Sequence, residues 1–289
     1  MKNSRLLTMI LAGVLLLVGC AGTTPPASQP PVPQPEPPEE EPFYEEASCC
    51  PPELPGEFIQ LGPVQPGEKI AVMQTSMGTI RIRLFPQYAP VTVENFVGLI
   101  GEGFYDGRIF HRVINTFMVQ AGGTSENPND SSSFFRDDAG NPQPFVDEFS
   151  DRVWHFRGAL SMANPGIPNQ NLSQFFIVQN STLEPSMEEF EAQLRAAGLP
   201  DEAVAQHMQN RQNQPSMEEQ LRTAGFPEDV IAQYARGGGT PHLDGGHTVF
   251  GHVIEGMDVV DAIAGVATGP GDRPAQDVVI TSVTIEVAS

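Results

Sequence analysis

The sequence predicts a mainly β fold in which short strands close into a barrel and helices cover its ends. Short stretches rich in β-branched and aromatic residues recur along the chain, separated by glycine, proline and asparagine. Two segments between them show helical periodicity, and a further segment has a different composition, rich in Glu, Gln, Ala and Met. Many short strands with few helices are typical of barrels, and 39% hydrophobic residues suffice for a core.

A hairpin and a helix open the folded part. "EKIAVMQTSMGTIRIRLF" predicts strands over 70–75 and 79–85, joined by a turn at 76–78. Pro90 suits the first turn of a helix, and Gly101 ends the helical pattern. The apolar residues of this helix recur at i, i+3, i+4 and i+7 and form one stripe: Val93, Phe96, Val97 and Ile100.

The remaining elements are also short. Six further β-rich runs predict strands, at 109–114, 117–121, 158–163, 175–179, 248–254 and 278–287. "GMDVVDAIAG" predicts a second short helix. Strands of this number with two helices suggest a closed barrel plugged by the helices.

A helical insert, 184–236, interrupts the β framework with two imperfect repeats, 185–208 and 215–235. Each repeat opens with a capping-box pattern, in which a serine is followed three residues later by a glutamate: Ser186 with Glu189, and Ser216 with Glu219. Each first helix ends at a glycine that is followed two residues later by proline. The insert is therefore predicted to form two helical hairpins.

Residues 1–19 predict a signal peptide. Lys2 and Arg5 precede an uncharged run, 6–18, that is too short for a comfortable membrane span. "LVGC" at the end of this run resembles the lipobox of bacterial lipoproteins, which implies cleavage before Cys20 and lipidation of that cysteine. This interpretation places the protein on the extracytoplasmic face of a bacterial cell membrane, held by a lipid anchor. The alternative is an ordinary secretory signal with a chance cysteine.

Residues 20–68 begin with the lipidated Cys20 and predict a disordered tether. They are rich in Pro and Glu and contain no lysine or arginine, so they cannot bury enough apolar surface to fold. Extended polyproline II conformation would span on the order of 100 Å. Cys49 and Cys50 lie in this tether, and the remaining domain, 69–289, has no cysteine and therefore neither a disulfide nor a thiol nucleophile.

The charge of the chain argues against nucleic-acid binding, and the spacing of its histidines argues against a metal site. The chain has 36 acidic and 15 basic residues, a formal net charge of -21, whereas nucleic-acid binding requires basic surface. His242, His247 and His252 are spaced five apart, which does not converge ligands on one face of a strand or helix. We expect neither a metal site nor a nucleic-acid partner.

"FHRVINTFMVQ", residues 110–120, places three polar side chains in an apolar stretch: His111, Arg112 and Gln120. In a regular strand Phe110, Arg112 and Ile114 share one face. The nearest acidic residues in sequence are not placed by strand geometry to pair with this guanidinium. Two interpretations remain open, a solvated strand arginine or a side chain that meets a ligand brought from outside.

Five separated blocks together resemble cyclophilins, a family of peptidyl-prolyl cis/trans isomerases: "FHRVINTFMVQ", "GALSMANPG", "SQFFIVQ", "LDGGHTVFGHVIEGMDVVDAI" and "GVATGPGDRPAQDVVITSVTI". They occur in the family's order, and the second hairpin of the insert resembles an insertion of cyclophilins from Gram-positive bacteria. The resemblance implies an eight-stranded antiparallel barrel capped by two helices, with a groove for an X-Pro segment on its outer face. One departure is His242, where well-studied eukaryotic members have tryptophan.

The resemblance also implies residue roles. Arg112 corresponds to the catalytic side chain. The other positions divide into a proline pocket of Phe117, Met118, Phe176 and Leu243, a backbone-binding pair of Gln120 and Asn164, and further groove residues His111, Ala163, Gln174 and His247. Rotation about X-Pro faces roughly 20 kcal/mol but changes no covalent bond, so it needs neither nucleophile, metal nor cofactor.

Two functions from different classes follow. The first is isomerisation of X-Pro bonds in exported proteins, with proline-containing unfolded or folding polypeptides as partners and the membrane reached through Cys20. The second is a noncatalytic peptide-binding or holdase module on the same scaffold. Arg112, Phe117, Gln120 and Phe176 occur together, which favours the enzyme because a scaffold would not require all four. The sequence does not set the oligomeric state.

Overall fold

The structure, a computed structural model, describes residues 58–289. The signal peptide, Cys20 and the tether as far as residue 57, with Cys49 and Cys50, lie outside the described residues. Their interpretation stays a prediction.

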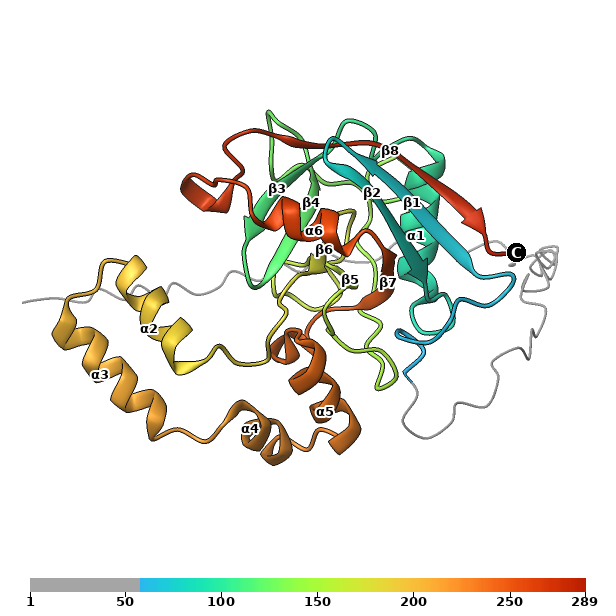
Figure 1. Cartoon of the computed structure of the whole chain (residues 1–289). Coiled ribbons are helices and arrows are strands. Elements are labelled where there is room, and N and C mark those ends of the chain that lie inside the picture. Colours follow the sequence, from blue (N-terminus) through green and yellow to red (C-terminus); the bar gives the residue numbers. More distant parts are fainter. Residues whose placement is uncertain (1–57) are drawn as a thin grey trace, which may run out of the picture. The chain divides into compact units, whose positions relative to one another are not determined.

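Eight antiparallel strands form a closed barrel in the order β1-β2-β7-β5-β6-β4-β3-β8 (Figure 1). The strands are β1 Lys69–Thr75, β2 Gly78–Leu84, β3 Ile109–Ile114, β4 Met118–Gly123, β5 Ala159–Met162, β6 Phe175–Val178, β7 Val249–Glu255 and β8 Val278–Val287. The predicted eight-stranded barrel is confirmed. Closure leaves no unpaired strand edge, because every strand has a neighbour on both sides.

Two helices, α1 Pro90–Gly101 and α6 Met257–Ala264, pack onto the barrel and complete its core. Phe96 of α1 is fully buried, and its ring lies 5.6 Å from the ring of Phe175 and 5.2 Å from that of Phe250, both in edge contact. Ile263 of α6 is also fully buried in this interior cluster. The two predicted capping helices are confirmed.

A β-bulge at His111 decides which side chains of β3 face outward. Phe110 pairs with Ala121 and Arg112 pairs with Gln120, so two steps along β3 match one step along β4. Phe110 therefore joins the interior cluster while Arg112 faces outward. The expectation that these two side chains share a face is wrong, because it assumed a regular strand.

The insert consists of four helices: α2 Met187–Ala196, α3 Asp201–Gln212, α4 Met217–Thr223 and α5 Glu228–Gly237. Both predicted capping boxes are present. In α2, the Ser186 hydroxyl accepts from the backbone N–H of Glu189, whose carboxylate accepts from the N–H of Ser186, and the start of α4 repeats this exchange. The two predicted hairpins are confirmed, and Figure 1 shows them as an arm beside the barrel.

The two hairpins differ in how much apolar surface they bury. The second hairpin, α4 and α5, places Leu221, Ile231 and Tyr234 in a cluster with Phe156 of the barrel domain. In the first hairpin, α2 and α3, Val204 is the buried hydrophobic residue. Within residues 58–289, no helix combines the length and apolarity needed to cross a membrane.

Residues 58–68 pack against the barrel domain, although their composition assigned them to the tether. Gln60 is 2% exposed, and its side-chain amide bonds both backbone groups of Trp154, at 2.8 and 2.7 Å. Arg83 forms an ion pair with Glu68 and donates to the Ile59 carbonyl at 2.5 Å. The compositional boundary at 68 is therefore too late, because the composition of 21–68 taken together hides a last stretch with apolar residues, of which Phe58 and Ile59 pack against the domain.

We expect residues 185–214, the first hairpin with its flanking turns, to be dispensable for folding. The backbone N–H of Met217 donates to the Glu184 carboxylate at 3.2 Å, so the two ends of the excised segment lie side by side. Deletion should shift Tm by less than about 4 °C, because little of the core is lost. As a control, Ile231→Ala in the second hairpin should destabilise by about 2–5 kcal/mol. Loss of cooperative melting in the deletion would contradict this expectation.

His252 predicts a pH dependence of stability. Burial, with a smaller effect from the Arg83 guanidinium, lowers the pKa of His252 to about 4, from 6.5 in the unfolded chain. Between these values the unfolded chain binds a proton that the native state does not, so stability falls as pH falls through this window. His252→Gln should flatten the plot of Tm against pH between 4 and 6.5, whereas His207→Gln, on the exposed surface of α3, should not. Parallel plots for wild type and His252→Gln would refute the assignment.

Candidate active site

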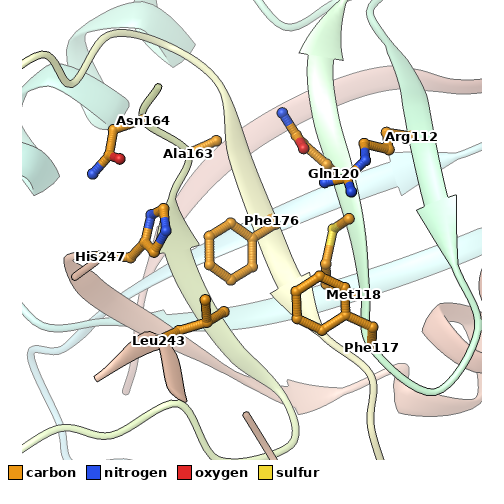
Figure 2. A pocket seen from close by; sticks show the side chains of 9 residues that line it. All are labelled: Arg112, Phe117, Met118, Gln120, Ala163, Asn164, Phe176, Leu243 and His247. Atoms are coloured by element: carbon orange, nitrogen blue, oxygen red, sulfur yellow. The ribbon is translucent and has the colours of Figure 1, made fainter. Parts of the chain in front are cut away.

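A pocket of about 210 Å³ lies on the outer face of the barrel, beside β3, β4, β6 and the short 3-10 helix η1 Pro241–Leu243. Nine residues line it: Arg112, Phe117, Met118, Gln120, Ala163, Asn164, Phe176, Leu243 and His247. All nine belong to the set that the sequence singled out. Figure 2 shows Arg112 and Gln120 on one side of Phe176, with Asn164 and His247 on the other.

Strand pairing places the central side chains in one row. Arg112 of β3 is the direct partner of Gln120 on β4, which is the partner of Phe176 on β6. Direct partners on antiparallel strands point to the same face with Cβ atoms about 5 Å apart. A guanidinium, an amide and an aromatic ring are therefore held side by side by the backbone itself.

The floor of the pocket is apolar. Met118 and Phe176 are 2% and 4% exposed, so the floor is rigidly packed. Phe117 lies in the turn before β4, and its ring stacks on the ring of His242 at 5.6 Å. The His247 ring meets Phe176 edge-on at 5.4 Å. This floor suits a small aliphatic ring, which aromatic faces contact without any polar requirement.

Gln120 is oriented by a neighbour behind the pocket. Gln174 donates both of its side-chain amide protons to backbone carbonyls, Asp130 at 2.9 Å and Pro128 at 3.1 Å. Its own oxygen accepts from Gln120 Nε2 at 3.0 Å. One proton of the Gln120 amide is used in this bond, and the second is directed by it.

Two residues expected in the groove do not line the pocket. Gln174 supports Gln120 from behind, as described. His111 is 7% exposed, and its Nδ1 accepts from the backbone N–H of Gly123 at 3.2 Å. The ring of His111 is directed toward the backbone of β4, so it does not share the outer face with Arg112.

Three histidines at or beside the site favour the neutral form. Burial is the main cause that lowers the pKa of His111, His242 and His247 below 6.5. His247 Nδ1 lies 3.0 Å from the Met162 carbonyl and donates to it, which fixes the tautomer. Arg112 is thus the one cationic side chain among the nine that line the pocket.

Arg112 has a partner that sequence analysis missed. Its Nε lies 3.5 Å from the carboxylate of Asp272, in the 3-10 helix η2 Pro270–Asp272, and the two side chains are 43% and 49% exposed. An ion pair this exposed contributes little, about 0–1 kcal/mol. The guanidinium therefore sits at the edge of the pocket without being firmly held elsewhere.

The lining of the pocket indicates its chemistry. In the part of the chain that the structure describes, no three His, Cys, Asp or Glu side chains group as metal ligands. One cation, two side-chain amides and an apolar floor suit a short polypeptide segment that carries a small ring. The fold and the pocket thus define a barrel that binds peptide segments on its outer face.

Residues 70–285 match the family of cyclophilin type peptidyl-prolyl cis-trans isomerases. The chain belongs to this family and is a peptidyl-prolyl cis/trans isomerase that acts on proline-containing polypeptides.

Three similar proteins illustrate the match. A "Putative peptidyl-prolyl cis-trans isomerase" of Staphylococcus aureus strain USA300 is 41% identical over 223 residues, which cover 77% of this chain and 94% of that protein. A "Putative bifunctional phosphatase/peptidyl-prolyl cis-trans isomerase" of Streptococcus pyogenes is 42% identical over 76% of this chain, but the match spans only 39% of that protein. The crystal structure of a Cryptosporidium parvum cyclophilin has a TM-score of 0.52 at 20% identity, with 77% of this chain and 99% of that chain covered, a likeness of fold.

Proposed function

We propose that isomerisation takes place in this pocket and that Arg112 is the catalytic donor. The row Arg112–Gln120–Phe176 carries the proposal, because strand register holds a charged donor, an amide and a ring contact at fixed spacing. A proline ring seated on Phe176 lies in the same row as the guanidinium. The eight other lining residues include no Asp, Glu, Lys or Arg, which favours a guanidinium that meets a ligand over a solvated strand arginine.

The reaction needs no covalent step. In planar X-Pro the nitrogen lone pair is delocalised into the carbonyl, and twisting the bond localises it on nitrogen. A guanidinium N–H that donates to this nitrogen binds the twisted state far better than the planar one, which lowers the barrier of roughly 20 kcal/mol.

The other lining residues hold the substrate while one group turns. The apolar floor fixes the proline ring, and Gln120, oriented by Gln174, offers its remaining amide proton to the rotating carbonyl. Asn164 has its amide nitrogen 3.2 Å from the Gly246 carbonyl, so its side chain is positioned at the opposite wall to bind substrate backbone. A holdase would need the floor but not the donors.

The substrates we propose are exported proteins. The support is the sequence alone: a charged start, an apolar run, the LVGC tetrapeptide and the acidic proline-rich segment that follows. Such an arrangement suits an isomerase anchored by lipidated Cys20 on the outer face of the cell membrane, where newly exported chains fold.

Arg112→Ala should reduce kcat/KM by on the order of a hundredfold, as expected when one donor that acts mainly in the transition state is removed. Peptide binding should weaken far less, and Arg112→Lys should restore little because an ammonium lacks the planar fork. Exchange NMR on an X-Pro peptide measures both quantities.

Asp272→Ala is the matched control, because it removes the ion-pair partner and leaves the guanidinium. It should change kcat/KM less than about fivefold. Equal catalysed rates for wild type and Arg112→Ala would overturn the proposed site.

Cys20 should carry the lipid. In a bacterial host, metabolic labelling with a palmitate analogue should mark the wild-type protein and not Cys20→Ala, while a variant of both tether cysteines, Cys49→Ala with Cys50→Ala, should label normally. Equal labelling of wild type and Cys20→Ala would refute lipidation at Cys20.

A further inference from the structure

A buried hydrogen-bond relay lies directly behind the apolar floor of the pocket. The Tyr234 hydroxyl donates to Asp244 Oδ2 at 2.5 Å, and Asp244 Oδ1 accepts from His155 twice, from Nδ1–H at 2.7 Å and from the backbone N–H at 2.9 Å. The far ring nitrogen of His155 lies 3.0 Å from the hydroxyl of Ser161. Tyr234, His155 and Ser161 are at most 1% exposed.

The relay touches two walls of the pocket. The His155 ring stacks on Phe176 with ring centroids 6.0 Å apart and planes 13° apart. Asp244 follows Leu243 directly and ends η1, the short helix that also carries His242 against Phe117. One carboxylate therefore fixes the back of the pocket floor and the position of one side wall.

The relay does not form a hydrolytic site, although Ser161, His155 and Asp244 lie next to one another in the order of a catalytic triad. Ser161 is 0% exposed, and its hydroxyl also lies 3.0 Å from the Thr248 carbonyl, to which it donates. A nucleophile needs access to substrate, and this oxygen has none. The arrangement acts on the pocket through packing.

Tyr234 belongs to α5, so the relay connects the insert to the pocket. Its ring packs edge-on against Phe156 at 4.8 Å, and burial together with the Asp244 carboxylate raises its pKa well above 10, so the hydroxyl stays a donor. The chain passes close to it at Gly239, where φ is +136° and a Cβ would lie 2.6 Å from the Tyr234 ring. In the first repeat the residue equivalent to Tyr234 is His207, which is exposed.

We infer that Tyr234 is a positioning residue for the proline pocket, acting through Asp244 and His155 on Leu243 and Phe176. This inference rests on the proposed active site. The second hairpin of the insert is then part of the substrate-binding machinery, and the first hairpin is not. The hydrogen bonds and ring contacts of the relay reach Phe176 and η1 but not Arg112 or Gln120. Loss of the Tyr234 hydroxyl should therefore affect binding of the ring and leave the donors in place.

The test is Tyr234→Phe, which removes one hydroxyl and keeps the ring. We expect KM for an X-Pro peptide to rise about fivefold with kcat unchanged, measured by exchange NMR over a range of peptide concentrations. A merely structural role gives a different result, because partial unfolding lowers the active fraction and hence kcat at constant KM. Tyr105→Phe is the matched control: Tyr105 is 1% exposed and donates to the Ser173 carbonyl at 2.9 Å, so it loses a similar buried bond and should keep the wild-type KM.

Asp244→Asn provides the second variant and applies even if Tyr234→Phe fails to fold. It should raise KM, and combining it with Tyr234→Phe should add little, because both changes break the same relay. Wild-type KM in folded Tyr234→Phe, or a fall in kcat alone, would overturn the inference. Arg112→Ala in the same assay separates the two proposals: its loss of activity beside an unaffected Tyr234→Phe refutes only the relay, whereas full activity of Arg112→Ala refutes the active site itself.

Discussion

The bulge at His111 is the constraint on which the site depends. Side chains alternate along a strand, so the register of one residue decides whether Arg112 enters the barrel or faces solvent. The extra residue lets Phe110 fill the interior while Arg112, two positions later, stands beside Gln120 on the outside. His111 itself is held by the Gly123 N–H, so the irregularity is stabilised by its own side chain. The row that we propose as catalytic depends on this irregular pairing of β3 with β4.

The electrostatics of the site follow from the same placement. The chain carries a net charge of -21, yet Arg112 is the one charged residue type among the nine that line the pocket, and burial lowers the pKa of His247. A guanidinium at the rim can pair with Asp272 while the pocket is empty, and because that pair is half exposed it costs little to redirect the guanidinium toward a prolyl nitrogen. A deeply buried ion pair would hold the arginine more firmly and make it less available. The weak pair is thus compatible with catalysis by a donor that is needed only in the twisted state.

Local sequence patterns predicted the helices and strands but not the contacts between residues far apart in the chain. Runs of β-forming residues placed all eight strands, helical spacing and the repeats of the insert placed the six α-helices, and the capping boxes fixed the starts of α2 and α4. The apolar stripe of α1 was only partly right, since Leu99 is fully buried where Val97 and Ile100 are half-buried. The site residues came from the family resemblance and not from spacing. Asp272, the His155–Asp244 contact and the anchoring of Gln60 join residues far apart in the chain, and no local pattern encodes such pairs.

The two repeats of the insert show which residues attach a hairpin to the barrel. Each keeps the features that a hairpin needs by itself: the capping box and an ion pair across its turn, Arg195 with Asp201 and Arg222 with Glu228. They differ at the docking positions, where the first repeat has the smaller Ala203 and the polar His207 in place of Val230 and Tyr234. The two copies therefore share the local features of a hairpin, whereas packing against Phe156 belongs to the second copy. Tyr234 both packs α5 against the barrel domain and bonds Asp244. Replacing it by histidine, the residue of the first repeat, would therefore weaken the docking of the hairpin and also remove its link to the pocket.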